Sequence, residues 1–247
     1  MTQYFFLDFD GVVCDSIPEC FVSSYRAYRE LLLGETVLEI PLRDRNMFYA
    51  YRPFIRSGAD YLLIQDMIRR GLRVNDQETF DADIARAGQT VMREYDRLFY
   101  QVRDTFLAND REFWLDLNSL FPGMKEILSK ARGVSGFYIL STKKPLFIRE
   151  ILLHHGIEWN SERILYTAEH SKRAIMESFM KKGDRAVFID DQLDHLLIAR
   201  PNPGIDGYLA SWGYVKQPWL EQKEIPLIGL DGLKTLVAGF CQAAQPA

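Results

Sequence analysis

The chain has 247 residues, of which 47% are hydrophobic and 26% are charged. This is enough apolar material for one sizeable core, or for a core domain with a smaller satellite domain. Its 30 basic and 34 acidic residues give a formal net charge of −4, so the chain as a whole lacks the basic footprint of nucleic-acid-binding proteins. The composition therefore favours a soluble globular protein with no nucleic-acid partner.

The first apolar run, Tyr4–Leu7, is interrupted at once by Asp8. It is too short for a signal peptide or a membrane span, so we interpret it as a buried strand and expect no membrane partner. The chain has three cysteines, an odd number, and they have no metal-ligand spacing. This favours a reduced, cytoplasmic setting. They are Cys14, Cys20 and Cys241.

The stretch that follows the first strand has a helical texture. Its amphipathic patterns cover Glu19–Leu33, Asp60–Arg70 and Gln89–Leu107, and no pair of strands stands out among them. We therefore predict that residues 17–119 form a helical cap domain. Proline and glycine in Leu120-Phe121-Pro122-Gly123 mark the return to the core.

Beyond this return, short apolar runs alternate with helical patterns. The runs lack the period-two alternation of half-exposed strands, which is typical of strands covered on both faces of a parallel sheet. They cover residues 137–140, 163–166, 186–189 and 207–210. Helices are predicted over Pro145–His155 and Ser171–Lys182, each followed by a glycine. The predicted fold is α/β: residues 1–16 and 120–247 form a Rossmann-like, doubly wound parallel sheet, with the α-helical cap inserted.

Polar clusters stand where three of the apolar runs end. These clusters are Asp8-Phe9-Asp10-Gly11, Ser141-Thr142-Lys143-Lys144 and Asp190-Asp191. The carboxyl ends of parallel strands share one edge of a sheet, and ligands bind at that edge near the topological switch point. We therefore expect the three clusters to converge.

Such a site concentrates up to four negative charges, on Asp8, Asp10, Asp190 and Asp191, and this is unfavourable without a cation. Oxygen ligands without histidine indicate a hard ion, and Mg²⁺ suits a site that also holds phosphate. Asp8 can attack phosphorus, as carboxylates do in aspartyl-phosphate chemistry. Asp10 can protonate the leaving alcohol and later deprotonate the attacking water.

Further residues of the clusters can hold the phosphoryl group. Gly11 permits the chain to turn away beside the phosphate. Either Ser141 or Thr142 offers a hydroxyl, with a backbone N–H after it, which places Lys143 among the expected substrate-binding residues. Lys172, at the start of the helix before Asp190-Asp191, can supply positive charge to the transferred group.

These motifs resemble the haloacid dehalogenase-like superfamily, in particular its phosphatase branch with a helical cap after the first motif. Residues 6–16 resemble the first motif, Phe121-Pro122-Gly123-Met124 the return from the cap, and residues 138–145 the second motif. Lys172 resembles the third motif and residues 188–191 the fourth. Trp212-Gly213-Tyr214 is similar to phosphoglycolate-phosphatase-like members.

The resemblance implies that Asp8 is nucleophile and magnesium ligand, and that Asp10 is the acid/base and binds the metal through its carbonyl. It implies one direct carboxylate in the fourth motif. Asp191 is favoured, and a register one residue earlier gives Asp190 with Asp194 behind it. In the second motif, alignment on Lys144-Pro145 selects Thr142, whereas the end of the apolar run selects Ser141. Asp10 disfavours the dehalogenase branch, which lacks an acid/base there.

One segment of the predicted cap, Arg43 to Arg56, holds four arginines among aromatic residues. Two of them, Arg52 and Arg56, are four residues apart and would share one face of a helix, where a guanidinium suits a second anionic group of the substrate. The alternative is a basic helix face with aromatic core contacts. The four histidines, His154, His155, His170 and His195, have no metal spacing and are interpreted as surface or structural residues.

The sequence thus predicts a magnesium-dependent phosphatase that hydrolyses a small phosphorylated metabolite through an aspartyl-phosphate. A phosphomutase on the same scaffold is the nearest alternative, and a catalytically idle binding protein is another. A phosphonate hydrolase would need a cap lysine, and no lysine lies between Met1 and Pro122.

Overall fold

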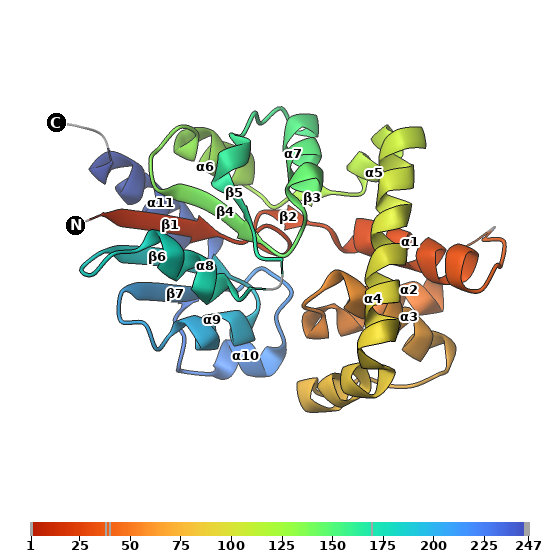
Figure 1. Cartoon of the computed structure of the whole chain (residues 1–247). Helices are drawn as coiled ribbons and strands as arrows, with labels where there is room; N and C mark the ends of the chain where they lie inside the picture. Colours follow the sequence, from red (N-terminus) through yellow and green to blue (C-terminus); the bar gives the residue numbers. More distant parts are fainter. Residues whose placement is uncertain (1, 38, 40, 169, 245–247) are drawn as a thin grey trace. The chain divides into compact units, whose positions relative to one another are not determined.

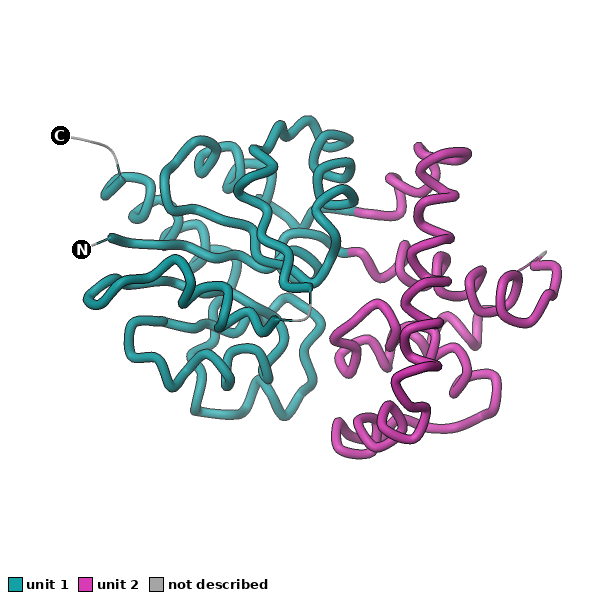
Figure 2. The backbone as a smooth tube through the Cα atoms, in the orientation of Figure 1, with its two compact units in different colours: residues 1–15, 119–247 teal, residues 16–118 magenta. Residues whose placement is uncertain are grey.

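The computed structural model describes residues 2–37, 39, 41–168 and 170–244 (Figure 1). The chain forms two compact units (Figure 2). The core unit comprises Met1–Asp15 and Ser119–Ala247, and the helical unit comprises Ser16–Asn118. Each junction lies one residue before the boundary expected from the sequence. The core unit is therefore built from two separate stretches of chain.

The core unit contains a parallel sheet with the strand order β5-β4-β1-β6-β7-β8. Its strands are β1 (Gln3–Leu7), β4 (Phe137–Ser141), β5 (Ile164–Tyr166), β6 (Arg185–Asp190), β7 (Ile205–Ala210) and β8 (Leu227–Ile228). The chain builds outward from β1 to β4 and β5, then returns to the other side of β1 for β6. β1 is therefore central, and the topological switch point lies beside it. The predicted α/β fold with a helical insertion is confirmed.

Neighbouring residues of β1 point to opposite faces of the sheet, where different helices cover them. Phe5 stacks on Phe137, with 4.9 Å between ring centroids, and meets the edge of Phe240. Phe6 instead packs into a buried cluster with Phe188 and with residues of the helices that precede and follow β6. Because both faces are covered, β1 contains no polar alternation. The helices of this unit are α6 (Met124–Ala131), α7 (Pro145–His154), α8 (Lys172–Phe179), α9 (Leu193–Ala199), α10 (Gln217–Glu221) and α11 (Leu230–Ala243), with a 3₁₀ turn η3 (Ser161–Arg163).

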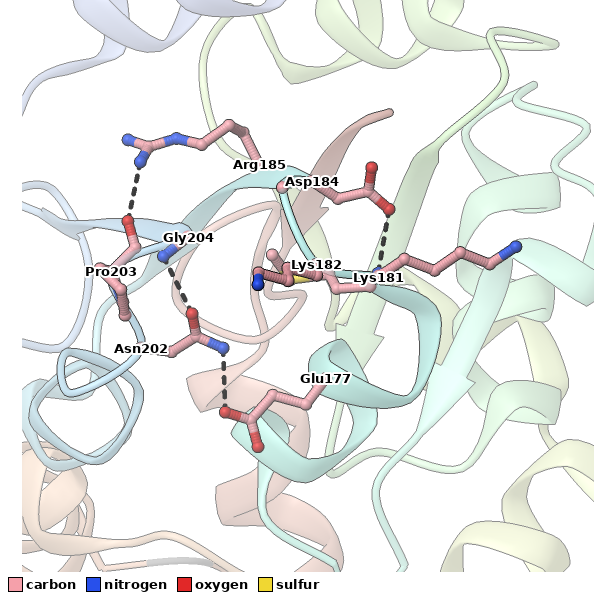
Figure 3. A pocket seen from close by; sticks show the side chains of 10 residues that line it. Glu177, Lys181, Lys182, Asp184, Arg185, Asn202, Pro203 and Gly204 are labelled. Carbon is pink, nitrogen blue, oxygen red and sulfur yellow. Dashed lines mark hydrogen bonds between the residues drawn. The ribbon is translucent and has the colours of Figure 1, made fainter. Parts of the chain in front are cut away.

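A cavity of about 560 Å³ lies at the amino end of β6 (Figure 3). Its polar groups largely satisfy one another: Asn202 donates to Glu177 over 3.0 Å, and the N–H of Lys181 donates to Asp184 over 3.0 Å. The cavity is therefore at the edge of the sheet opposite the strand ends that carry the polar clusters.

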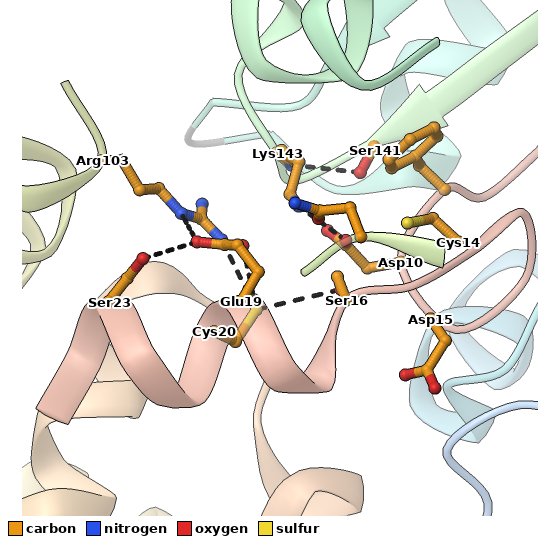
Figure 4. Close-up of polar contacts among 12 residues, drawn as sticks. Asp10, Cys14, Asp15, Ser16, Glu19, Cys20, Ser23, Arg103, Ser141 and Lys143 are labelled. Carbon is orange, nitrogen blue, oxygen red and sulfur yellow. Dashed lines mark hydrogen bonds and ion pairs between the residues drawn. The ribbon is translucent and has the colours of Figure 1, made fainter. Parts of the chain in front are cut away.

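The helical unit consists of α1 (Ile17–Arg26), a π-helical turn η1 (Ala27–Leu32), α2 (Leu42–Tyr51), a 3₁₀ turn η2 (Arg52–Phe54), α3 (Gly58–Arg69), α4 (Gln77–Asn109) and α5 (Arg111–Asp116). A buried ion pair joins α1 to α4: the guanidinium of Arg103 contacts both carboxylate oxygens of Glu19, over 2.8 and 2.6 Å (Figure 4). Ser23 and the indole N–H of Trp114 donate to the same carboxylate. The buried charge of Glu19 is thus fully hydrogen-bonded.

Several elements differ from the prediction. The predicted helix over Gln89–Leu107 is part of α4, which begins twelve residues earlier and is interrupted at Gly88, where φ is 78°. The helix predicted to reach Lys182 ends at Phe179, since Met180 is extended. Three two-residue strands were not predicted: β8, and the antiparallel pair β2 (Cys14–Asp15) and β3 (Ser119–Leu120).

Among the described residues, we find no helix with the length and apolar character needed to cross a bilayer.

Candidate active site

The three polar clusters converge because β4, β1 and β6 are adjacent in the sheet. Asp8 directly follows β1, and its N–H donates to the carbonyl of Ile189 over 3.0 Å. Ser141 ends β4 and Asp190 ends β6. The expected convergence at the carboxyl edge is therefore present in the fold.

Lys172 connects two of these strand ends. It is the first residue of α8, whose N-cap Ser171 accepts the N–H of Ala174. The Lys172 Nζ lies 2.8 Å from Oδ1 of Asp8 and 2.8 Å from Oδ2 of Asp190. All three side chains are buried. The ammonium group thus bridges two carboxylates where little water screens the charges.

Three buried carboxylates gather at this edge. Asp8, Asp190 and Asp191 each offer one oxygen, and these oxygens lie within 4.8 Å of one another. The Oδ2 of Asp191 accepts the N–H of Tyr214 over 2.7 Å. Oxygen-only donors at such spacing suit a hard divalent cation. The single positive charge of Lys172 does not balance three carboxylates, so the cluster keeps a net negative charge. The residues present therefore fit a divalent metal ion.

Burial and neighbouring charges change the acid strength of these groups. Burial raises the pKa of Asp8 to about 7, the charge of Asp190 adds to this rise, and Lys172 opposes it. The pKa of Asp190 is lowered: burial works against its charged form, but Lys172 and His195 outweigh that effect. Asp190 is thus the stable anion, and Asp8 is the carboxylate that gains most from an added positive charge.

Asp10 and Gly11 form the turn after β1. The Oδ1 of Asp10 lies 2.9 Å from Nζ of Lys143, which extends from the loop after β4 (Figure 4). Gly11 has φ of 86°, and a Cβ atom at this position would collide with the carboxylate of Asp191. A glycine is required there both for the backbone angle and for the close approach. The turn thereby keeps Asp10 near the ends of both neighbouring strands.

The two candidate hydroxyls of the second motif differ in exposure. Ser141 is buried, and its Oγ accepts the N–H of Lys143 over 3.1 Å. Thr142, the next residue, is only partly buried. The structure brings both to the strand end, and their roles remain predictions.

Comparison with known proteins bears on this geometry. The family model of haloacid dehalogenase-like hydrolases matches residues 2–201, which includes all four motifs. The chain belongs to the haloacid dehalogenase-like (HAD) hydrolases. A search of curated proteins found no match to this HAD-like hydrolase.

Solved structures share the fold of this HAD-like hydrolase at low sequence identity. A predicted phosphatase from Clostridium acetobutylicum is 18% identical with a TM-score of 0.55, over 96% of this chain and 98% of that chain. A predicted phosphoglycolate phosphatase from Haemophilus somnus is 14% identical with a TM-score of 0.59, over 96% and 97%. A HAD-superfamily hydrolase of subfamily IA from Geobacter sulfurreducens is 12% identical with a TM-score of 0.51, over 97% and 96%.

Two residues of the site in this HAD-like hydrolase were not predicted from the sequence. His195, interpreted as a surface or structural residue, places Nδ1 3.0 Å from Oδ2 of Asp190. Tyr214 holds Asp191 through its backbone N–H and donates its hydroxyl to Asp15 over 3.0 Å. The resemblance of Trp212-Gly213-Tyr214 to related phosphatases was the available signal for Tyr214. For His195, the only signal in the sequence was its position five residues after the end of β6.

The two arginines expected to contact substrate make contacts within the helical unit. They do not lie on one helix, because α2 ends at Tyr51 and the turn η2 begins at Arg52, with Pro53 unable to donate a backbone hydrogen bond. Arg52 is buried, donates to the carbonyl of Ile55 over 3.3 Å and lies 5.5 Å from the ring centroid of Tyr61. Arg56 pairs with the carboxylate of Asp81 over 2.8 Å. These contacts favour structural roles, and substrate binding by either arginine stays a prediction.

Alanine replacements separate these roles. We expect Arg52→Ala to lower the free energy of unfolding by about 1–3 kcal/mol, because buried packing and a hydrogen bond are lost. Arg56→Ala should cost less than about 1 kcal/mol, because its ion pair is partly exposed. Thermal unfolding measures both effects. An unchanged melting temperature together with a raised KM for a phosphorylated metabolite, but not for p-nitrophenyl phosphate, would instead assign the arginine to the substrate.

Proposed function

We propose that this HAD-like hydrolase is a magnesium-dependent phosphatase that acts on a small phosphomonoester through an aspartyl-phosphate on Asp8. The observation that carries the proposal is the bridge from Lys172 to Asp8 and Asp190 at the central strand ends, with Asp10 two residues after Asp8. A carboxylate at this place has a positive charge beside it and a second carboxyl group within reach of a leaving oxygen.

The chemistry proceeds in two displacements. A carboxylate oxygen of Asp8 attacks phosphorus, the bond from phosphorus to the ester oxygen breaks, and Asp10 gives its proton to that oxygen. Water then attacks the phosphorus of the aspartyl-phosphate, Asp10 takes a proton from this water, and the bond to Asp8 breaks. Asp8 is regenerated and inorganic phosphate leaves.

The remaining residues of the site bind the transferred phosphoryl group and stabilise its negative charge. Lys172 stabilises negative charge on the transferred phosphoryl group, and the turn at Gly11 allows the backbone to approach it. Of the two hydroxyls, we favour Thr142 as the phosphate contact, because Ser141 is buried and accepts the N–H of Lys143. We further propose that the backbone at Lys143, which follows this hydroxyl, contacts the phosphoryl group.

A magnesium ion would be held by Asp8 and by Asp191, the favoured direct carboxylate of the fourth motif, with the carbonyl of Asp10 as a further ligand. When bound, it would neutralise the repulsion between the substrate phosphate and the carboxylate cluster. The raised pKa of Asp8 in the absence of metal is consistent with this need for positive charge.

The proposed acid/base role of Asp10 predicts that its replacement lowers kcat by an amount that depends on the leaving group. We expect Asp10→Asn to lower kcat by about 10²- to 10⁴-fold on an alkyl phosphate, the usual contribution of a positioned acid/base. The loss should be smaller on p-nitrophenyl phosphate, because p-nitrophenol leaves with little protonation. Steady-state rates on both substrates measure the difference, and equal losses on both would contradict the acid/base role.

A screen of phosphorylated metabolites tests the proposed function. The protein is incubated with each compound and Mg²⁺, and released inorganic phosphate is measured. Release from at least one small phosphomonoester supports the phosphatase. Transfer to a second hydroxyl without phosphate release would indicate a phosphomutase, and no reaction with any compound would favour a binding protein.

A further inference from the structure

Asp190 is surrounded by hydrogen-bond donors from three parts of the core unit. Lys172 from α8 and His195 from α9 both contact its Oδ2, over 2.8 and 3.0 Å. The N–H of Gln192, in the loop between β6 and α9, donates to its Oδ1 over 2.8 Å. Asp190 is completely buried. Its orientation is therefore set by three partners, and His195 is the one side chain among them that has no place in the chemistry described above.

Local geometry explains how His195 reaches Asp190. β6 ends at Asp190 and α9 begins at Leu193, so His195 lies in the first turn of the helix. Its N–H donates to the carbonyl of Gln192 over 3.1 Å, which fixes the start of the helix against the loop. Because a carboxylate only accepts hydrogen bonds, Nδ1 carries the proton in this contact. The side chain is 18% exposed.

The shared oxygen connects His195 to the nucleophile. The Oδ2 of Asp190 binds the ammonium group of Lys172, and the same group contacts Asp8 over 2.8 Å. If the carboxylate of Asp190 rotated about its side-chain bonds, the ammonium group of Lys172 would either move with it or lose the contact. In the first case, the distance between Lys172 and Asp8 would change. The Nδ1–H of His195, as a second donor to the same oxygen, opposes this turn.

We propose that His195 is a positioning residue: its Nδ1–H holds Asp190 so that Lys172 stays between Asp190 and Asp8. This inference rests on the proposed function. In this arrangement Asp190 anchors the lysine, and Asp8 with Asp191 is left to hold the cation. His195 itself touches neither the substrate nor the reacting atoms.

Two replacements distinguish a positioning role from simple packing. His195→Leu fills similar space without a donor. His195→Asn places an amide nitrogen where Nδ1 stands, because both atoms are bonded to Cγ, and so keeps the donor. His154→Leu, on α7, is the matched control, since His154 is also partly exposed and lies at the far end of a helix from the strand ends.

Trifluoroberyllate with Mg²⁺ is a suitable probe, because it binds an aspartate oxygen as a phosphoryl group does and requires no turnover. Fluorine NMR measures its binding. We expect His195→Leu to raise the dissociation constant by about 10- to 100-fold, the usual cost of removing a group that orients a site residue. His195→Asn should recover most of the loss, and His154→Leu should bind as the wild type does.

Turnover of p-nitrophenyl phosphate provides the second readout. His195→Leu should lower kcat and leave KM nearly unchanged, whereas a change in folding stability alone would alter neither at a temperature where the variant is folded. Wild-type binding by His195→Leu, or equal losses in the leucine and asparagine variants, would overturn the positioning role. A wild-type protein that does not bind trifluoroberyllate would overturn the proposed function, and the inference with it.

Discussion

Replacing Asp8 by asparagine is expected to abolish phosphate release and to leave the fold intact. An amide cannot form the aspartyl-phosphate, so kcat should fall by about 10⁶-fold, as it does when a covalent nucleophile is removed from other enzymes. The amide oxygen can still accept the hydrogen bonds that Phe9 and Lys172 donate to Oδ1 of Asp8. The packing of the strand end is therefore preserved.

The stability of this variant gives an independent check. Burial raises the pKa of Asp8 to about 7 in the metal-free protein, so the stability that this residue costs the fold grows as pH rises from about 4 to 7 and stays at its full value above pH 7. At pH 8 the melting temperature of metal-free Asp8→Asn should thus equal or exceed that of the wild type. Asp231→Asn, at an exposed position on α11, is the control and should keep full activity. Wild-type turnover by Asp8→Asn would exclude the covalent mechanism.

Removing divalent cations is the second change with a large expected effect. Asp8, Asp190 and Asp191 place three carboxylates in one buried cluster, which a phosphate dianion cannot approach without added positive charge. We expect a chelator to abolish turnover and Mg²⁺ to restore it, with Mn²⁺ or Co²⁺ able to replace Mg²⁺. Full turnover in metal-free buffer would rule out the magnesium assignment.

Metal binding should also be visible without turnover. A ligand at a hundred times its dissociation constant stabilises the folded state by about 2.7 kcal/mol. For a chain of this size that corresponds to a rise in melting temperature of roughly 5–10 °C. Asp191→Asn should reduce this rise, whereas Asp231→Asn should not. An equal rise in both variants would show that the ion binds elsewhere.

The main strands were predictable because burial on both faces leaves an unbroken apolar run, as in the Tyr4–Leu7 stretch of β1. The strands that were missed, β2, β3 and β8, have two residues each, which is too short for any periodicity to appear. The helix predicted over Gln89–Leu107 begins directly after the interruption of α4 at Gly88, and the part of α4 before this glycine, from Gln77, was not predicted.

The position of Asp8 at the edge of the sheet was predictable for a similar reason: a charged residue directly after a buried strand marks the edge of a parallel sheet. The hydrogen-bond partners of Asp190 and Asp191 could not be predicted from the sequence. The contact of His195 with Asp190 depends on how α9 is placed in three dimensions, and that of Tyr214 with Asp191 on the loop after β7. The expected common face of Arg52 and Arg56 was wrong because it assumed a helix that continues through Pro53.

The central position of β1 has a consequence for protein synthesis. Phe5 pairs with Phe137 on one side and with Val187 on the other, so both neighbours of β1 are translated long after it. At about 5–20 residues per second, the second neighbour appears roughly 10 to 40 seconds later. During this delay the helical unit, which is continuous in sequence, can fold on the ribosome, while Phe5, Phe6 and Leu7 remain unpaired. The strand that ends at Asp8 is thus exposed to chaperones, or to aggregation, until the sheet can close around it.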